Sequence, residues 1–129
     1  MIDFHNHILA NVDDGPNDIE VSLDMLKCAS QQGITQIVQT VHFQHPKIDG
    51  KNVEYNYLNN KIKKMQSVID EENLNIRMHL AAEVFYLPNL VEISTNPLVT
   101  IGNQRYMLIE FTSNIFPVNY EKEFSFEKL

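Results

Sequence analysis

The stretch GITQIVQTVHFQHP, at residues 33–46, decides how this 129-residue chain folds. Residues 34–42 within it are rich in β-branched side chains and predict a strand. Gly33 stands where a helix ends, because glycine accommodates the left-handed backbone found at that position. Pro46 and Gly50 interrupt the polar segment that follows and predict a loop. A helix, a strand and a loop in this order indicate a sheet whose strands alternate with helices.

The sequence on both sides continues this alternation. Upstream, residues 1–5 predict a short strand, and Asn17 or Asp18 can cap the helix that leads to Gly33. The apolar residues of that helix recur at the spacing of one face: Ile19, Leu23, Leu26 and Ala29. Downstream, the predicted elements are a helix at 53–72, a strand at 76–86, a short helix at 88–93, a strand at 105–111 and a helix start at 119–129. The apolar stripe of the helix at 53–72 is Leu58, Ile62, Met65 and Ile69. This order predicts parallel strands with right-handed crossovers in one α/β domain.

The composition excludes several classes of protein. Hydrophobic residues make up 43% of the chain, which is enough for a packed core. A net charge of −7 argues against nucleic-acid binding, and no polybasic patch offers itself to a membrane surface. The first residues lack the basic and apolar regions of a signal peptide, and no apolar run approaches the roughly 18 residues of a membrane span. We therefore expect a cytoplasmic protein without membrane insertion.

The single cysteine, Cys28, cannot form an intrachain disulfide, which fits a reducing compartment. It lies in the middle of the first predicted helix, and no CxxxxxR phosphate loop surrounds it. We expect Cys28 to be a packed core thiol and not a nucleophile. The sequence also has no GxxxxGKS/T loop, so it gives no support for nucleotide-driven phosphoryl transfer.

His5-Asn6-His7 is the strongest chemical signal in the chain. Side chains on a strand alternate between its faces, so His5 and His7 point the same way, about 6.6 Å apart along the strand. Two imidazoles at that spacing can chelate one divalent metal ion. Taken alone, the pair is equally compatible with a surface or core role, so its meaning depends on the other strands.

Each further predicted strand carries a ligand-type side chain at or near its carboxyl end: His42, Glu83 and Glu110, with Asp13 and Asp14 in the loop after the histidine pair. In parallel β/α folds the active site forms at that edge. Glu83 and Glu110 follow apolar residues, and burying a carboxylate is costly unless it is paired or bound to a metal. Histidine and carboxylate ligands together suit Mn²⁺, with Fe²⁺, Zn²⁺ and Co²⁺ as alternatives. Several such ions close together indicate phosphoester hydrolysis.

Three other polar residues have simpler interpretations. We expect Asp13 to form the turn or to support a ligand without binding metal itself. His45 is expected to be a loop histidine, and His79 a core histidine with its hydrogen bonds satisfied, because it lies about 13 Å before Glu83 on the strand.

Five motifs taken together resemble the bacterial manganese-dependent tyrosine-protein phosphatases of the PHP (polymerase and histidinol phosphatase) superfamily, which are associated with capsular and exopolysaccharide synthesis. The motifs are HNH at 5–7, VDDGP at 12–16, TVH at 40–42, AAEVFY at 81–86 and YMLIEF at 106–111. They cover the whole chain in order and with compatible spacing. VDDGP is the most specific of them, because other PHP enzymes share the histidine pair but usually not this continuation.

The resemblance implies that residues 1–129 are a single, incomplete domain, the N-terminal part of a distorted (β/α)7 TIM-like barrel with a trinuclear metal centre. It implies that His5 and His7 bind the first metal, Glu83 bridges the first and second, and Glu110 binds the second. Asp14 and His42 would bind the third. The implied reaction is hydrolysis of a phosphotyrosine protein by a metal-bound hydroxide, without a phosphocysteine intermediate. The implied substrate is a bacterial tyrosine kinase of polysaccharide export.

The chain departs from this family in two ways. Family members are roughly twice as long, and their second half supplies a further histidine, an Asp-x-His pair and phosphate-binding arginines. In addition, residues 43–46 read FQHP where many relatives carry basic residues. We therefore expect weak or no activity from this chain alone, and a homo-oligomer formed through an exposed strand edge at 105–111. The alternatives are a non-catalytic metal-binding remnant or interaction module, and another PHP enzyme such as a histidinol-phosphate phosphatase, against which VDDGP argues.

Overall fold

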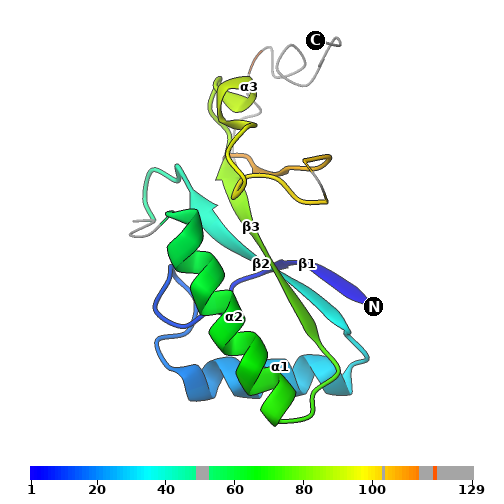
Figure 1. Ribbon diagram of the computed structural model, residues 1–129. Helices are drawn as coiled ribbons and strands as arrows, with labels where there is room; N and C mark the ends of the chain where they lie inside the picture. The colour runs from blue at the N-terminus through cyan, green and yellow to red at the C-terminus, as the bar shows by residue number, and fades with distance from the viewer. Residues whose placement is uncertain (49–52, 103, 114–117, 119–129) are drawn as a thin grey trace.

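The computed structural model describes residues 1–48, 53–102, 104–113 and 118, and it shows a curled parallel sheet with helices packed along it (Figure 1). The elements in order are β1 (Ile2–Asn6), α1 (Ile19–Gln31), β2 (Gln36–Phe43), α2 (Tyr55–Glu71), β3 (Arg77–Phe85), α3 (Leu90–Ile93) and β4 (Leu108–Glu110). The strands lie in the order β1-β2-β3-β4, and each neighbouring pair is parallel. The predicted α/β fold is therefore confirmed. The helix expected at 119–129 lies outside the described residues.

Helix α1 begins and ends where the sequence indicates. Asp18 is its N-cap and accepts a hydrogen bond from the Glu20 N–H, and Gly33 follows its C-terminus with a φ of +79°. Its buried face is only partly the predicted one. Leu26 and Ala29 are buried, but the third buried residue is Ser22, whose hydroxyl donates to the Ile8 carbonyl oxygen at 2.6 Å.

Two expectations about α1 are wrong. Ile19 is 52% exposed, because it lies in the first turn beside an open hollow that Lys61 and Lys64 also line. Cys28 is exposed and not a core thiol, because it lies off the stripe of buried residues that runs through Leu26 and Ala29.

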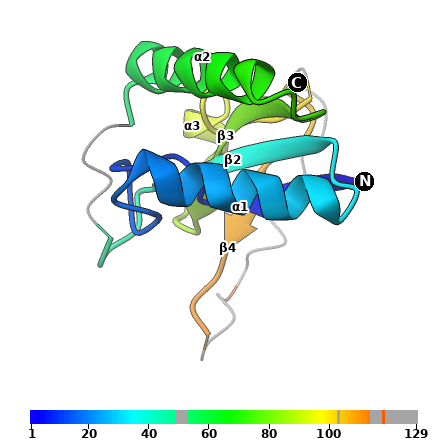
Figure 2. The ribbon, with the colours of Figure 1, turned by 90° about the horizontal axis from the view of Figure 1, so that it is seen from below.

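Helix α2 follows its predicted pattern more closely. All four residues of the predicted apolar stripe are buried: Leu58, Ile62, Met65 and Ile69. The helix begins at Tyr55 because the Glu54 carboxylate accepts the N–H groups of Asn56 and Tyr57. Figure 1 shows α2 running alongside β3, and Figure 2 shows α1 and α2 with β2 and β3 visible between them. The two helices share one hydrophobic core with the sheet. No helix in the described ranges has the length and apolar character that a membrane crossing requires.

The strands present two different faces. Ile37 and Val41 of β2 belong to the core shared with the helices, whereas Val38 and Thr40, which alternate with them, face the opposite, concave side. On that side Thr40 pairs with Ala81, and His42 pairs with Glu83. The parallel register therefore places His42 and Glu83 at the same level near the carboxyl ends of their strands.

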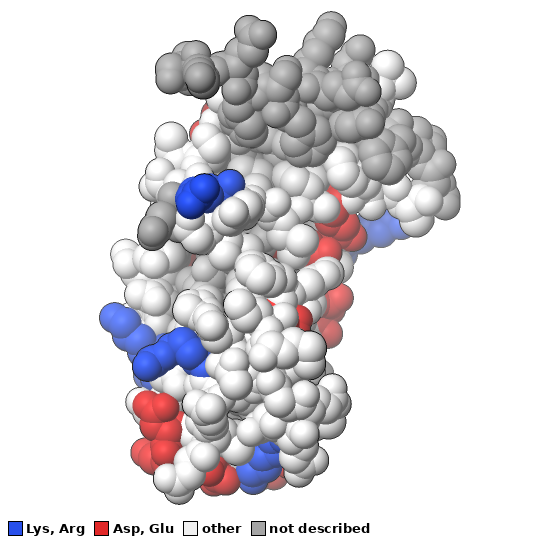
Figure 3. Space-filling view, turned by 90° about the vertical axis from the view of Figure 1, so that its right-hand side faces the viewer, with Lys and Arg blue, Asp and Glu red and all other residues white. Residues whose placement is uncertain are grey.

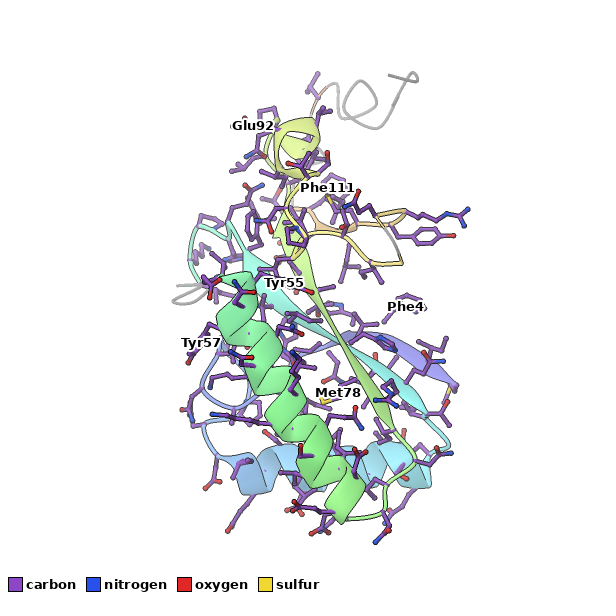
Figure 4. All side chains as sticks on the ribbon, in the orientation of Figure 1. Phe4, Tyr55, Tyr57, Met78, Glu92 and Phe111 are labelled. Atoms are coloured by element: carbon purple, nitrogen blue, oxygen red, sulfur yellow. The ribbon has the colours of Figure 1, made fainter. Side chains whose placement is uncertain are left out.

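An irregularity in β1 brings its histidines to the concave side. Three residue steps from Asp3 to Asn6 lie opposite two steps from Ile37 to Gln39. Phe4 and His5 both lie within this irregularity: Phe4 lines an open hollow of about 460 Å³, and His5 reaches Glu83. Figure 4 shows Phe4 beside β1 at the edge of the sheet, and Figure 3 faces the open side, where uncharged residues cover most of the middle.

Two elements and one side chain near the open edge differ from expectation. Strand β4 is shorter than the predicted 105–111, because Tyr106 forms an antiparallel bridge with Ile101 instead. The short helix α3 begins at Leu90, after Asn89, and not at residue 88. His79 is exposed and bonded to Gln36 Oε1 at 3.1 Å, so the expected core position is wrong. The reason is that its side chain stands out from the sheet at the open hollow that Phe4 and Val38 also line.

Candidate metal centre

The carboxyl end of β1 brings two histidines next to Glu83. The Nε2 atoms of His5 and His7 lie 2.9 and 3.2 Å from Glu83 Oε2, and 3.2 Å from each other. Glu83 is only 7% exposed and comes from β3, two strands away. A buried carboxylate needs a compensating positive charge. Three ligand atoms that converge around such a carboxylate are suited to a divalent cation.

Asp13 sets the orientation of the His7 ring. Its side chain is 1% exposed, and its Oδ2 lies 2.9 Å from His7 Nδ1. The backbone N–H groups of Gly15 and His42 donate to the same carboxylate at 3.1 and 3.4 Å. Because Nδ1 of His7 carries the hydrogen that Asp13 accepts, its Nε2 keeps a free lone pair on the side of Glu83. A carboxylate that accepts the hydrogen of one ring nitrogen, while the other ring nitrogen binds the ion, is typical of histidines that bind metals.

The same contact changes the pKa values of both partners. Burial opposes protonation of His7, but the hydrogen bond to Asp13 and the charges of Asp13, Glu83 and Asp14 outweigh it and raise the pKa of His7 above 6.5. Burial likewise disfavours the Asp13 carboxylate, but hydrogen bonds from His7 and from the Gly15 N–H outweigh it and lower the pKa of Asp13 below 3.8. In the metal-free protein the two groups therefore form an ion pair under mildly acidic conditions.

Gly15 lets the acidic turn approach the end of β1. A Cβ atom at this position would lie 2.5 Å from the carbonyl oxygen of His7, which no side chain tolerates. The Asn11 N–H closes the turn by donating to the Pro16 carbonyl oxygen at 2.9 Å. The VDDGP segment thus has a structural reason to follow the histidine pair, because its glycine allows Asp13 to reach His7.

His42, at the end of β2, faces the remaining carboxylates. Its Nε2 lies 3.2 Å from Asp14 Oδ1, and its Nδ1 lies 3.6 Å from Glu83 Oε2 and 3.8 Å from Glu110 Oε2. Its ring stacks on that of His7 with a centroid distance of 4.7 Å. Within the described part of the chain, the buried His42 Nδ1 and Glu110 Oε2 have no hydrogen-bond partner. Two buried polar atoms in that state are available to bind cations.

The structure brings all six predicted ligands to one place. Three overlapping groups have ligand atoms within 4.8 Å of one another: His5, His7 and Glu83; His42, Glu83 and Glu110; and His7, Asp13, Asp14 and His42. The expected convergence at the strand ends is observed, whereas metal binding by each residue stays a prediction. His45 lies in the loop after β2, as expected, but its side chain is only 12% exposed and its Nε2 lies 3.6 Å from Glu110 Oε1. The left-handed backbone of Gln44, with a φ of 52°, turns His45 toward the site, and no spacing rule reveals such a turn.

Comparison with known proteins places this geometry in a family. The chain is 32% identical to CapC of Staphylococcus aureus over 91% of its own length and 45% of the relative's. It is 31% identical to the tyrosine-protein phosphatase CpsB of Streptococcus pneumoniae, with 87% of this chain and 45% of that protein covered. The chain spans about half the length of the curated relatives it matches.

A solved structure shows the same fold. The work on YwqE from Bacillus subtilis and CpsB from Streptococcus pneumoniae, described as metal-dependent tyrosine phosphatases, gives a match with a TM-score of 0.83 and 26% identity. The match covers 96% of this chain and 49% of the solved one, as expected for the N-terminal part of a PHP barrel. The model of the family "Capsular polysaccharide synthesis, CpsB/CapC" matches residues 1–120. The chain therefore belongs to the CpsB/CapC family of capsular polysaccharide synthesis proteins.

Proposed function

We propose that this chain is the metal-binding portion of a protein phosphatase that hydrolyses phosphotyrosine. The observation that carries the proposal is the convergence of His5 and His7 on the buried carboxylate of Glu83. The relatives support the choice of reaction, because CpsB and YwqE are tyrosine-protein phosphatases and are described as metal-dependent.

The proposal assigns six residues to three cation positions. The first position is held by His5, His7 and Glu83. The second position is held by Glu83 and Glu110, and the third is held by Asp14 and His42. Mn²⁺ is the proposed ion, with Fe²⁺, Zn²⁺ and Co²⁺ as alternatives, because histidine and carboxylate ligands suit these ions. Bound cations supply Lewis-acid chemistry, polarising the phosphoryl oxygens and lowering the pKa of a coordinated water.

The protein's own groups account for orientation and access. Asp13 holds His7 in the tautomer whose Nε2 can bind a cation. The side chains of His5 and Asp14 are 49% and 54% exposed, so a phosphate group can approach from their side, whereas Glu83 is buried beneath them. Cys28 lies on α1 and in none of the ligand groups, so the proposed reaction has no phosphocysteine intermediate.

The proposed substrate is a phosphorylated tyrosine on a bacterial tyrosine kinase of polysaccharide export, in the cytoplasm. The family's link to capsular polysaccharide synthesis supports this choice. We also propose that the chain self-associates on its open side, where Phe4 is 52% and Tyr106 62% exposed.

The test is hydrolysis of a phosphotyrosine peptide by the purified chain with Mn²⁺. We expect slow release of phosphate, well below the roughly 1–10³ s⁻¹ typical of enzymes, that chelation abolishes. Glu83→Gln should abolish it too, because this variant removes a charge shared by two cation positions. His79→Gln is the matched control, since His79 lies on the same strand face as Glu83 but outside the ligand groups. Release that persists in chelator, or equally in Glu83→Gln, would contradict the proposal.

A further inference from the structure

His45 lies in the loop after β2, wedged between two rings of the site. Its ring makes edge-on contacts with His42 at a centroid distance of 5.3 Å and with Phe85 at 5.1 Å. The side chain is only 12% exposed. A largely buried histidine in a polar loop needs partners for both of its ring nitrogens.

The backbone fixes which nitrogen of His45 carries the hydrogen. Nδ1 accepts the N–H groups of Lys47 and Ile48 at 3.1 and 3.0 Å. A nitrogen that accepts two N–H groups is unprotonated, so the hydrogen of the neutral ring lies on Nε2. That hydrogen occupies the lone-pair position through which Nε2 would bind a metal. His45 therefore faces the centre as a hydrogen-bond donor and not as a ligand.

The donor points at Glu110. Nε2 of His45 lies 3.6 Å from Glu110 Oε1, and the other carboxylate oxygen, Oε2, is the buried atom that faces His42 Nδ1. The separation exceeds a normal hydrogen bond by about half an ångström. A small rotation of the carboxylate would close this gap. Glu110 belongs to a strand of only three residues, so its backbone alone constrains the carboxylate weakly.

We propose that His45 is a positioning residue for the metal centre: its Nε2–H donates to Glu110 Oε1 and thereby holds Oε2 toward the cation position shared with Glu83. This inference rests on the proposed function, because it requires Glu110 to bind a metal. It adds a residue whose contribution lies in the affinity for metal and not in contact with the substrate. Hydrogen-bond partners of metal ligands typically change metal affinity by about 10–100-fold.

Two substitutions separate the two ring nitrogens. Asparagine places its oxygen near the position of Nδ1, so His45→Asn keeps the loop contacts but loses the donor to Glu110. Glutamine reaches to the position of Nε2, so His45→Gln keeps a donor but loses the loop acceptor. Mn²⁺ affinity of the purified chain, measured by calorimetric titration, should fall roughly 10–100-fold in His45→Asn and stay close to wild type in His45→Gln. If instead His45→Gln lost Mn²⁺ affinity and His45→Asn kept it, His45 would act in the loop alone and the inference would be overturned. Unchanged affinity in both variants, or an equal loss of affinity in both, would overturn it too.

Two further measurements distinguish a failure of the proposed metal centre from a failure of the role proposed for His45. If Glu110→Gln binds Mn²⁺ as the wild type does, Glu110 is not a ligand, and the proposed centre and the role of His45 fail together. If Glu110→Gln binds more weakly but His45→Asn does not, only the inference about His45 fails. Ring-nitrogen NMR of the metal-free chain should show His45 protonated on Nε2, and protonation on Nδ1 would overturn the argument from the tautomer.

Discussion

Replacing Asp13 with asparagine tests how the buried turn supports the metal centre. The Asp13 carboxylate accepts three N–H groups, from His7 Nδ1, Gly15 and His42. An asparagine side chain offers one oxygen and turns an NH₂ group toward at least one of these donors. A buried N–H without an acceptor costs about 1–3 kcal/mol. Asp13→Asn should therefore lower the free energy of unfolding by that amount.

The same substitution should weaken metal binding. When the asparagine turns its NH₂ group toward His7, Nδ1 of the ring must accept and the ring hydrogen moves to Nε2, which then no longer presents a free lone pair beside His5 and Glu83. We expect a loss of Mn²⁺ affinity of roughly 10–100-fold. Urea unfolding in chelator measures the first effect, and calorimetric titration with Mn²⁺ measures the second.

Asp14→Asn is the matched control. The Asp14 side chain is 54% exposed and faces His42 and His7 at 3.2 and 3.8 Å. It should lose affinity for metal while the unfolding midpoint in chelator stays close to wild type. If Asp13→Asn unfolds and binds Mn²⁺ like the wild type, the argument from the buried carboxylate is refuted.

Three further outcomes are expected. Because the pKa of His7 is raised in the folded chain, His7 stabilises the metal-free fold fully below pH 6.5 and loses this effect as the pH rises through its folded-state pKa. Because the pKa of Asp13 is lowered, Asp13 stabilises the fold above pH 3.8 and loses this effect as the pH falls through its own folded-state pKa. Urea midpoints in chelator should therefore be highest between these two values, and Asp13→Asn should flatten the profile; an identical profile in that variant would contradict the assignment. Gly15→Ala should lower the free energy of unfolding by about 1–3 kcal/mol, because the new Cβ would meet the His7 carbonyl oxygen at 2.5 Å. Thermal unfolding measures this loss of stability, and an unfolding midpoint equal to that of the wild type would refute the predicted clash. Cys28→Ser and alkylation of Cys28 should leave Mn²⁺ affinity and phosphatase activity unchanged, because the thiol is exposed on α1 and belongs to none of the ligand groups; inactivation without unfolding would show that the thiol takes part.

The sequence predicted those features that depend on regular periodicity. The stripe of α2 was correct because an amphipathic helix on a sheet buries one face along its whole length. The convergence of His42 and Glu83 was predictable because parallel strands end at one edge, and their register makes the two residues direct partners.

Features that depend on tertiary context were not predictable. Ser22 is buried because its hydroxyl bonds to the Ile8 carbonyl oxygen, which no hydrophobic pattern reveals. His79 is exposed because it lies at the open hollow that Phe4 and Val38 also line. The role of His45 depends on the left-handed turn at Gln44 and on the loop N–H groups that its ring accepts. Each of these facts arises from how separate segments meet.

The most direct test of the central claim is anomalous diffraction from crystals of the chain grown with Mn²⁺. We expect an anomalous peak coordinated by the Nε2 atoms of His5 and His7 and by Glu83, with further density beside Glu110 or between Asp14 and His42. Glu83→Gln crystals should lose the first peak. Peaks that lie only elsewhere on the surface, or the same peak in Glu83→Gln, would contradict a metal centre built on these residues.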